Sequence, residues 1–142
     1  MWLVDKGQDR MISMGFTINE RGTFPEVLKL VREAWADPKL KLVNFFFLGK
    51  AYWRKEKNWK IEDHIRHITT PLKTKEDLRK FLQDYYNQPM RTDISPWELL
   101  YIENYQEDMS VGCLKHHHVL ADGLTMSSFA TTTNGQKVEY YV

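Results

Sequence analysis

Apolar residues recur at helical spacing between residues 24 and 36. The positions of this stripe are adjacent or lie three to four residues apart: Val27, Leu28, Val31, Ala34 and Trp35. Thr23 precedes the stripe as an N-cap, Pro25 lies in the first turn, and Glu26 holds the third position of a capping box. Asp37 and Pro38 interrupt the pattern. These signals predict a first helix.

A second stretch with the same period follows residue 74. Thr74 is placed to cap it, and Asp77 occupies the acidic third position. Its apolar stripe comprises Leu78, Phe81, Leu82 and Tyr85. Residues 87–89, Asn-Gln-Pro, stop the pattern, so a second helix is predicted between the cap and this stop.

Four further stretches have the length of strands. Residues 40–48 hold the densest apolar run and predict a buried strand, while residues 59–68 carry isoleucines in an imperfect alternation. Residues 97–105 are apolar on both faces. After a polar turn, residues 109–118 should return antiparallel to complete a hairpin. A strand that is apolar on both faces must be covered on both sides.

The predicted order of elements is β-α-β-β-α-β-β-α, with the last helix starting near Gly123. This order indicates a mixed α/β (α+β) fold, and the absence of a linker or repeat predicts one domain over residues 1–142. We expect the first two helices to cover one side of the 97–118 hairpin. Only the segment after Gly123 then remains for the other side, which predicts a large exposed apolar patch.

Composition narrows the class of protein. The 20 basic and 19 acidic residues give a net charge of +1, so the total charge provides no argument for nucleic acid or an anionic membrane. An aromatic content of 13% requires a deep core, a ligand tunnel or a partner surface. No apolar run approaches the roughly 20 residues of a membrane span. The opening residues lack the apolar stretch of a signal peptide.

Cys113 is the one cysteine, so no disulfide can form within the chain and a reducing compartment is expected. We expect this residue to be a small buried side chain in a strand. The expected location is cytoplasmic, with association at a lipid surface left open.

Three of the five histidines, at positions 116–118, stand together at the end of a predicted strand. Because side chains alternate along a strand, His116 and His118 should share one face and His117 the other. Strand ends that lead into loops commonly carry chemistry in α/β folds. Asp122 and Gly123 follow closely in the sequence.

Four interpretations of this cluster compete. A zinc site could use His116, His118 and Asp122, although no HExxH or paired CxxC spacing accompanies them. A Ser-His-Asp triad would need a nucleophile from the pair Ser127 and Ser128, neither of which lies in a GxSxG turn. The cluster could also be a purely structural strand end capped by the aspartate. The fourth interpretation is a single histidine that acts as a general base. It would lie on a rigid turn whose conformation Gly123 permits and Asp122 stabilises.

Residues 117–123 read HHVLADG and fit the pattern HHxxxDG. This pattern is the signature of a superfamily that includes chloramphenicol acetyltransferase, carnitine acyltransferases and the condensation domains of peptide synthetases. Residues 113–123 as a whole resemble the matching stretch of bacterial and plant wax ester synthase/diacylglycerol acyltransferases. Other stretches similar to that family are Trp53 and residues 59–67, 88–90 and 95–99. The resemblance spans about residues 24–129.

Several features depart from the family pattern. Arg91 stands where an aspartate is usual, and residues 95–97 read Ser-Pro-Trp, so that only Trp97 of the family's Pro-Leu-Trp carries over. The opening residues do not align with the family's usual start. Members of the family are much longer and have two similar halves with the active-site tunnel between them. We therefore expect a missing C-terminal half or a partner subunit.

The resemblance implies the N-terminal half of a chloramphenicol-acetyltransferase-like, CoA-dependent acyltransferase fold. It implies an O-acyltransferase that moves a fatty acyl group from acyl-CoA to a long-chain alcohol or diacylglycerol, as in wax ester and triacylglycerol synthesis. Acyl-CoA is a substrate in that reaction, and neither a cofactor nor a metal is expected. The alternative is a truncated, non-catalytic relative that acts as a structural or interaction subunit. Peripheral association with a membrane or lipid droplet would suit either substrate.

The same resemblance assigns roles to individual residues. His118, the second histidine of the motif, is the implied general base, since an imidazole accepts and returns a proton near neutral pH. The implied supporting residues of the motif are His117, Asp122 and Gly123, with the aspartate pairing to an arginine. Candidates for the wall of the substrate tunnel are Trp97 and His116. Structural roles are expected for His64 and His67, and Lys115 is expected to be an exposed strand residue.

Overall fold

A computed structural model describes residues 11–18, 22–35, 37–118 and 120 of the 142-residue chain. Its helices and strands are β1 (Met11–Ile18), α1 (Phe24–Ala34), β2 (Leu42–Phe47), β3 (Lys50–Lys55), β4 (Ile65–Ile68), α2 (Lys75–Asn87), β5 (Trp97–Tyr105) and β6 (Met109–His117). Short 3-10 turns at Pro38–Lys41 and Ile61–His64 precede β2 and β4. No helix among these residues is both long and apolar enough to cross a membrane.

Both predicted helices are confirmed, together with their N-terminal signals. The Thr23 hydroxyl and backbone N–H both donate to the Glu26 carboxylate at 2.8 Å, at the start of α1. At the start of α2, the Asp77 backbone N–H donates to the Thr74 hydroxyl at 3.1 Å, and the Asp77 carboxylate accepts from the Thr74 backbone N–H at 3.0 Å. The backbone N–H groups satisfied in this way, those of Thr23, Thr74 and Asp77, have no partner inside the helices.

The main sheet has four strands in the order β1-β6-β5-β4. The predicted hairpin is confirmed, because β5 and β6 pair antiparallel from Trp97 opposite His116 to Tyr105 opposite Met109. β1 adds antiparallel to β6, and β4 adds parallel to β5. β4 is shorter than the strand expected over residues 59–68, because Ile61–His64 form a 3-10 turn instead.

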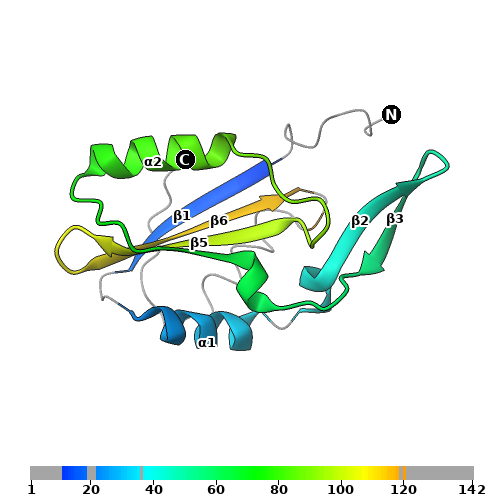
Figure 1. Ribbon diagram of the computed structural model, residues 1–142, viewed down its shortest axis with the longest axis horizontal. Coiled ribbons are helices and arrows are strands. Elements are labelled where there is room, and N and C mark those ends of the chain that lie inside the picture. The colour runs from blue at the N-terminus through cyan, green and yellow to red at the C-terminus, as the bar shows by residue number, and fades with distance from the viewer. Residues whose placement is uncertain (1–10, 19–21, 36, 119, 121–142) are drawn as a thin grey trace.

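The two helices lie on opposite faces of the sheet (Figure 1). The α1-side core comprises Val27, Val31, Trp35, Leu40, Ile61, Ile65, Trp97, Leu99, Tyr101, Leu114 and Leu120. The α2-side core comprises Tyr85, Leu100, Ile102, Tyr105, Val111 and Cys113, with Leu78, Phe81 and Leu82 packed against them. The expectation that both helices cover one side was therefore wrong. β4 and β5 are parallel, so α2 must cross over one face between them, and this leaves the other face for α1.

The expected apolar patch on the sheet is also wrong for the described part of the chain, since each sheet face is covered by a helix. Exposed large hydrophobic side chains occur elsewhere, at Leu30, Phe45, Phe47, Leu48, Tyr52 and Trp53. The strand expected to be buried over residues 40–48 is in fact β2, whose only partner strand among the described residues is β3, in a separate two-stranded sheet. Val43 of β2 and Leu40 of the preceding 3-10 turn are buried, whereas Phe45 and Phe47 are exposed.

Candidate active site at the end of β6

The three adjacent histidines have three different environments. His116 is fully buried and lies opposite Trp97 in the β5–β6 ladder. His117, the last residue of β6, is half-buried, and its backbone N–H donates to the Pro96 carbonyl at 2.9 Å. His118 is exposed in the turn that follows. The expected alternation therefore applies to the first two histidines only, because the strand ends before His118.

The turn that carries His118 is anchored on both sides. Before it, β6 is paired along its length with β5 and β1. After it, the Leu120 backbone N–H donates to the His117 carbonyl at 2.9 Å, and the Leu120 side chain packs in the α1-side core. An exposed imidazole is thus held on a short, braced segment. Asp122, Gly123, Ser127, Ser128 and the helix expected near Gly123 lie outside the described residues.

Trp97, at the start of β5, is buried beside this turn. Its indole N–H donates to the Leu40 carbonyl at 2.8 Å. The Trp35 ring meets it edge-on at 5.1 Å, and the His64 ring stacks on it at 4.4 Å with 11° between the planes. These contacts fix the segment that leads to Pro96 and thereby the partner of the His117 N–H. The assignment of Trp97 and His116 to a tunnel wall stays a prediction.

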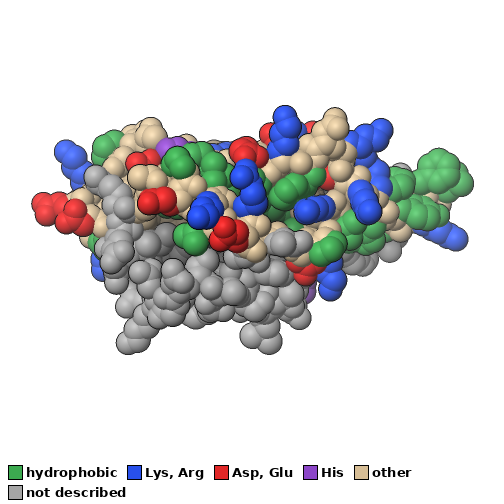
Figure 2. Space-filling view, turned by 90° about the horizontal axis from the view of Figure 1, so that it is seen from below, with side chains coloured by type: hydrophobic (Ala, Val, Ile, Leu, Met, Phe, Trp, Pro, Cys, Tyr) green, Lys and Arg blue, Asp and Glu red, His purple; other side chains and the backbone are tan. Residues whose placement is uncertain are grey.

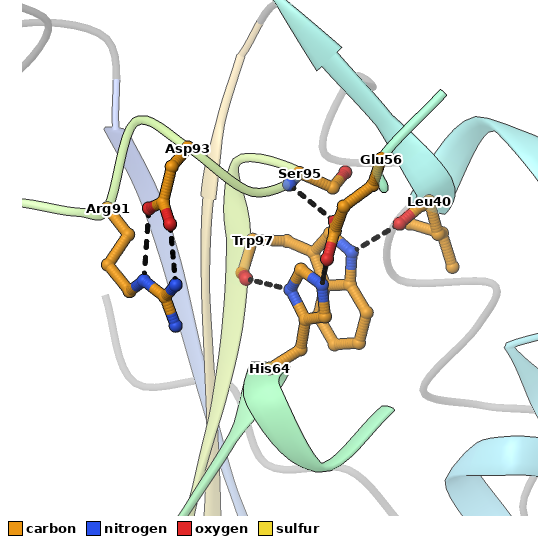
Figure 3. Close-up of polar contacts among 7 residues, drawn as sticks. All are labelled: Leu40, Glu56, His64, Arg91, Asp93, Ser95 and Trp97. Carbon is orange, nitrogen blue, oxygen red and sulfur yellow. Dashed lines mark hydrogen bonds and ion pairs between the residues drawn. The ribbon is translucent and has the colours of Figure 1, made fainter. Parts of the chain in front are cut away.

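A buried polar pair, Glu56 and His64, supports the same segment (Figure 3). The Glu56 carboxylate accepts the Ser95 backbone N–H at 2.8 Å and faces His64 Nε2 at 3.0 Å. His64 Nδ1 lies 3.1 Å from the Trp97 carbonyl oxygen. A carbonyl can only accept, so Nδ1 carries a hydrogen and donates it.

The expectation of a structural role for His64 agrees with this geometry. The sequence did not lead us to predict a role for Glu56. A pattern that could have indicated one is that Glu56 is the only acidic residue among the basic side chains of residues 50–60. A lone carboxylate in such a stretch is a candidate for burial with a partner. His67 also has a structural setting, since Nε2 contacts the Glu103 carboxylate at 2.5 Å and the ring stacks on Phe24 at 4.2 Å.

Arg91, which stands where the family has an aspartate, binds Asp93 through two hydrogen bonds of 3.1 and 2.6 Å (Figure 3). The guanidinium lowers the pKa of the Asp93 carboxyl group, chiefly through these bonds. Both side chains are largely exposed, in the loop before β5. An exposed ion pair of this kind contributes little to stability.

The expectation that Lys115 is exposed was wrong. Its side chain is buried, and its ammonium group donates to the carbonyl oxygens of Tyr85 at 3.3 Å and Tyr86 at 3.2 Å, and also to that of Gln88. The last carbonyls of a helix have no intrahelical donor and carry partial negative charge, so an ammonium group there replaces the missing donors. Burial lowers the pKa of Lys115.

Cys113 is a buried strand residue, as expected. Its sulfur lies 2.7 Å from the Tyr86 hydroxyl. Burial raises the pKa of the thiol to about 11, which keeps it protonated and unreactive near neutral pH. A nucleophilic role for this cysteine is therefore disfavoured.

Across the ranges that the structure describes, no group of three or more His, Cys, Asp or Glu side chains is arranged to hold a metal ion. His116 is enclosed in the protein and His118 is exposed beyond the end of the strand. The third ligand of the zinc hypothesis, Asp122, lies outside the described residues. The zinc site therefore stays a prediction.

Comparison with known proteins identifies the family. Residues 22–136 match the model of the wax ester synthase/diacylglycerol acyltransferase catalytic domain. The chain belongs to this family. No curated protein matches the sequence.

Solved structures share the fold. The wax ester synthase/diacylglycerol acyltransferase from Marinobacter aquaeolei VT8 is 20% identical with a TM-score of 0.70, over 92% of this chain and 35% of that one. The tallysomycin biosynthesis protein TlmII is 15% identical with a TM-score of 0.72, over 92% of this chain and 33% of that one. The X-domain from teicoplanin biosynthesis is 19% identical with a TM-score of 0.71, over 90% of this chain and 28% of that one.

These matches confirm the mixed α/β, chloramphenicol-acetyltransferase-like acyltransferase fold that the motif implied. The chain spans about a third of the length of the solved structures it matches. The activity of the complete protein is therefore proposed in the next subsection and is not taken from these matches.

Proposed function

We propose that the protein containing this chain is an O-acyltransferase that moves a fatty acyl group from acyl-CoA to the hydroxyl of a long-chain alcohol or diacylglycerol. One observation carries the proposal. In a chain of this family, the second histidine of the HHxxxDG pattern, His118, is exposed on a braced turn at the end of β6. A general base needs both properties: access to the substrate and a fixed position.

The proposed reaction uses one imidazole in two steps. His118 accepts the proton of the acceptor hydroxyl while that oxygen attacks the thioester carbonyl of acyl-CoA. The tetrahedral intermediate then collapses, the C–S bond breaks, and the imidazolium returns its proton to the CoA thiolate. The products are an ester and free CoA. Thiolate is a good leaving group, so the reaction needs no covalent enzyme intermediate and no cofactor besides acyl-CoA as substrate.

The residues around His118 have supporting roles in this proposal. The His117 backbone N–H holds the turn to the Pro96 carbonyl, just before β5, and Leu120 holds it to the core. Asp122 and Gly123 complete the motif and are proposed to shape the turn rather than to move protons. The remainder of a family member's length would supply the second wall of the tunnel, where exclusion of water strengthens the base's interaction with its substrate.

The test compares His118→Ala with His117→Ala in the natural protein that contains this chain. Turnover is followed as CoA thiol released from palmitoyl-CoA, with hexadecanol or diacylglycerol as acceptor. We expect His118→Ala to lower kcat about 10²–10⁴-fold while acyl-CoA binding persists, as for loss of a general base. His117→Ala keeps the backbone N–H that donates to Pro96, so it should act only through loss of the half-buried side chain, with a slightly lower melting temperature and a smaller loss of kcat.

Two results would contradict the assignment. Equal catalytic losses in both variants at unchanged stability would show that the two histidines have no separate roles. Absence of turnover in the wild-type protein, with acyl-CoA and both acceptors supplied, would favour the alternative of a non-catalytic subunit. The choice between alcohol and diacylglycerol depends on the relative kcat/KM values, because apolar walls discriminate weakly between chains.

A further inference from the structure

The β2–β3 hairpin carries nearly all of the exposed large hydrophobic side chains described in the chain. In the part of the chain that the structure describes, the hairpin strands pair only with each other, and they project from one end of the main sheet (Figure 1). The exposed side chains, with their exposed fractions, are Phe45 (37%), Phe47 (61%), Leu48 (84%), Tyr52 (41%) and Trp53 (41%). Leu30 on α1 is the sixth on the described surface. Exposed apolar area that is concentrated on one projecting hairpin is typical of a surface that binds another protein or a membrane.

The hairpin turn has an unfavourable residue at its tip. Leu48 adopts a φ of 49° and Gly49 a φ of 73°, so both turn residues lie in the left-handed region. Two-residue hairpin turns of this kind favour Asn, Asp or Gly, because a branched apolar side chain is strained there. Leu48 gains no compensating burial, since it is the most exposed hydrophobic side chain described. Asparagine would fit this backbone conformation better, and replacing the exposed leucine would remove no buried contact.

Positive charge is concentrated around the same hairpin. Residues 39–60 contain seven Lys and Arg but only one acidic residue, Glu56. The Glu56 carboxylate is buried against His64 and Ser95, so it does not offset the charge at the surface. In Figure 2, Lys and Arg side chains gather beside hydrophobic ones at the end of the molecule where the hairpin projects. The total charge of +1 conceals this asymmetry, since the rest of the chain is acidic.

Aromatic and basic side chains occur together on the hairpin, in a combination that suits a lipid interface. Phe45 stacks on its cross-strand partner Tyr52 at 5.6 Å, and Phe47 lies opposite Lys50. Aromatic rings favour the headgroup level of a bilayer, and Lys and Arg reach phosphate groups while their stems stay in apolar surroundings. A protein partner is a poorer match, because lysine is depleted from protein interfaces.

We propose that the β2–β3 hairpin binds the protein to anionic phospholipid surfaces. Leu48 and Phe47 enter the acyl-chain boundary, the rings of Phe45, Tyr52 and Trp53 lie at the headgroup level, and the surrounding cations contact lipid phosphates. This binding is independent of acyl transfer, so the His118→Ala variant should bind vesicles as the wild type does.

The test is sedimentation of the natural protein that contains this chain with vesicles made of equal parts phosphatidylcholine and phosphatidylglycerol, and with vesicles of phosphatidylcholine alone. The first variant is Leu48→Asn, which removes the apolar tip and places a residue suited to positive φ. We expect its partition coefficient to fall about tenfold while its melting temperature stays equal or rises. Its control is Leu30→Gln, an exposed leucine lost from α1, which should bind as the wild type does.

The second variant tests the charge. Lys50→Gln combined with Arg54→Gln should lower binding to the anionic vesicles about tenfold or more, because each cation near such a surface contributes about a fivefold factor. The control combines Lys29→Gln with Lys80→Gln, which removes the same charge from the two helices. Binding by the wild type should weaken as salt is raised.

Three results would overturn the proposal. The first is absence of binding to anionic vesicles by the wild type. The second is an equal loss in the hairpin variants and their controls, which would indicate nonspecific adsorption. The third is an oligomer, seen by analytical ultracentrifugation without lipid, that dissociates in Leu48→Asn while no variant binds vesicles. That outcome would assign the hairpin to a second copy of the chain.

Discussion

Removal of the Glu56 carboxylate provides the sharpest test of the buried support beneath the His118 turn. Glu56→Ala leaves the Ser95 N–H without its acceptor and His64 Nε2 without its partner, both in the protein interior. Breaking a buried hydrogen-bonded pair by removing one member lowers the free energy of unfolding by about 3–5 kcal/mol. For a chain of this size, that loss corresponds to a fall in melting temperature of roughly 10–20 °C.

Glu56→Gln is the matched variant, because the geometry allows an amide to satisfy both partners. Its oxygen can take the place of Oε2, which accepts from Ser95 at 2.8 Å. Its nitrogen then takes the place of Oε1, 3.2 Å from His64 Nε2, and donates to a neutral imidazole whose hydrogen is on Nδ1. We therefore expect Glu56→Gln to lose less than about 1 kcal/mol.

Thermal and urea unfolding followed by circular dichroism would measure both variants. The reasoning fails if Glu56→Gln is as unstable as Glu56→Ala, or if Glu56→Ala unfolds within about 0.5 kcal/mol of the wild type, the range of an ordinary surface substitution. In an active protein, the alanine variant should also lower kcat, because Ser95 leads into the Pro96 carbonyl that holds His117. The glutamine variant should restore it.

Two further predictions concern chemistry at single sites. Acyl transfer should survive a strong chelator, and elemental analysis should find less than one zinc per chain; stoichiometric zinc with activity lost on chelation would instead favour His116, His118 and Asp122 as ligands. Cys113 should resist a thiol-specific disulfide reagent at pH 8 in the folded protein, because its pKa is raised to about 11 and the thiol is protonated below that value. Denaturant should expose it to rapid labelling, and equally rapid labelling of the folded chain would contradict the burial.

Local sequence signals determined the helices and the central hairpin of this protein. The caps at Thr23 and Thr74 and the stripes that follow them depend on neighbours within one or two turns, and both helices form where those signals lie. β5 forms with the predicted bounds, because alternation and a polar turn are also local. The second strand of the hairpin was predicted over residues 109–118, and β6 ends one residue earlier, at His117.

Only the tertiary structure decided which surfaces are covered. The parallel pairing of β4 with β5 joins residues far apart in the sequence, and it sends α2 across one face while α1 covers the other. The same long-range packing buries Lys115 against the end of α2 and buries Glu56 beside His64. Among the described strands it leaves β2 and β3 paired only to each other, so an apolar run that predicted a buried strand forms a hairpin with exposed side chains at Phe45, Phe47 and Leu48. Periodicity records how apolar a face is, whereas burial depends on what the rest of the chain places against it.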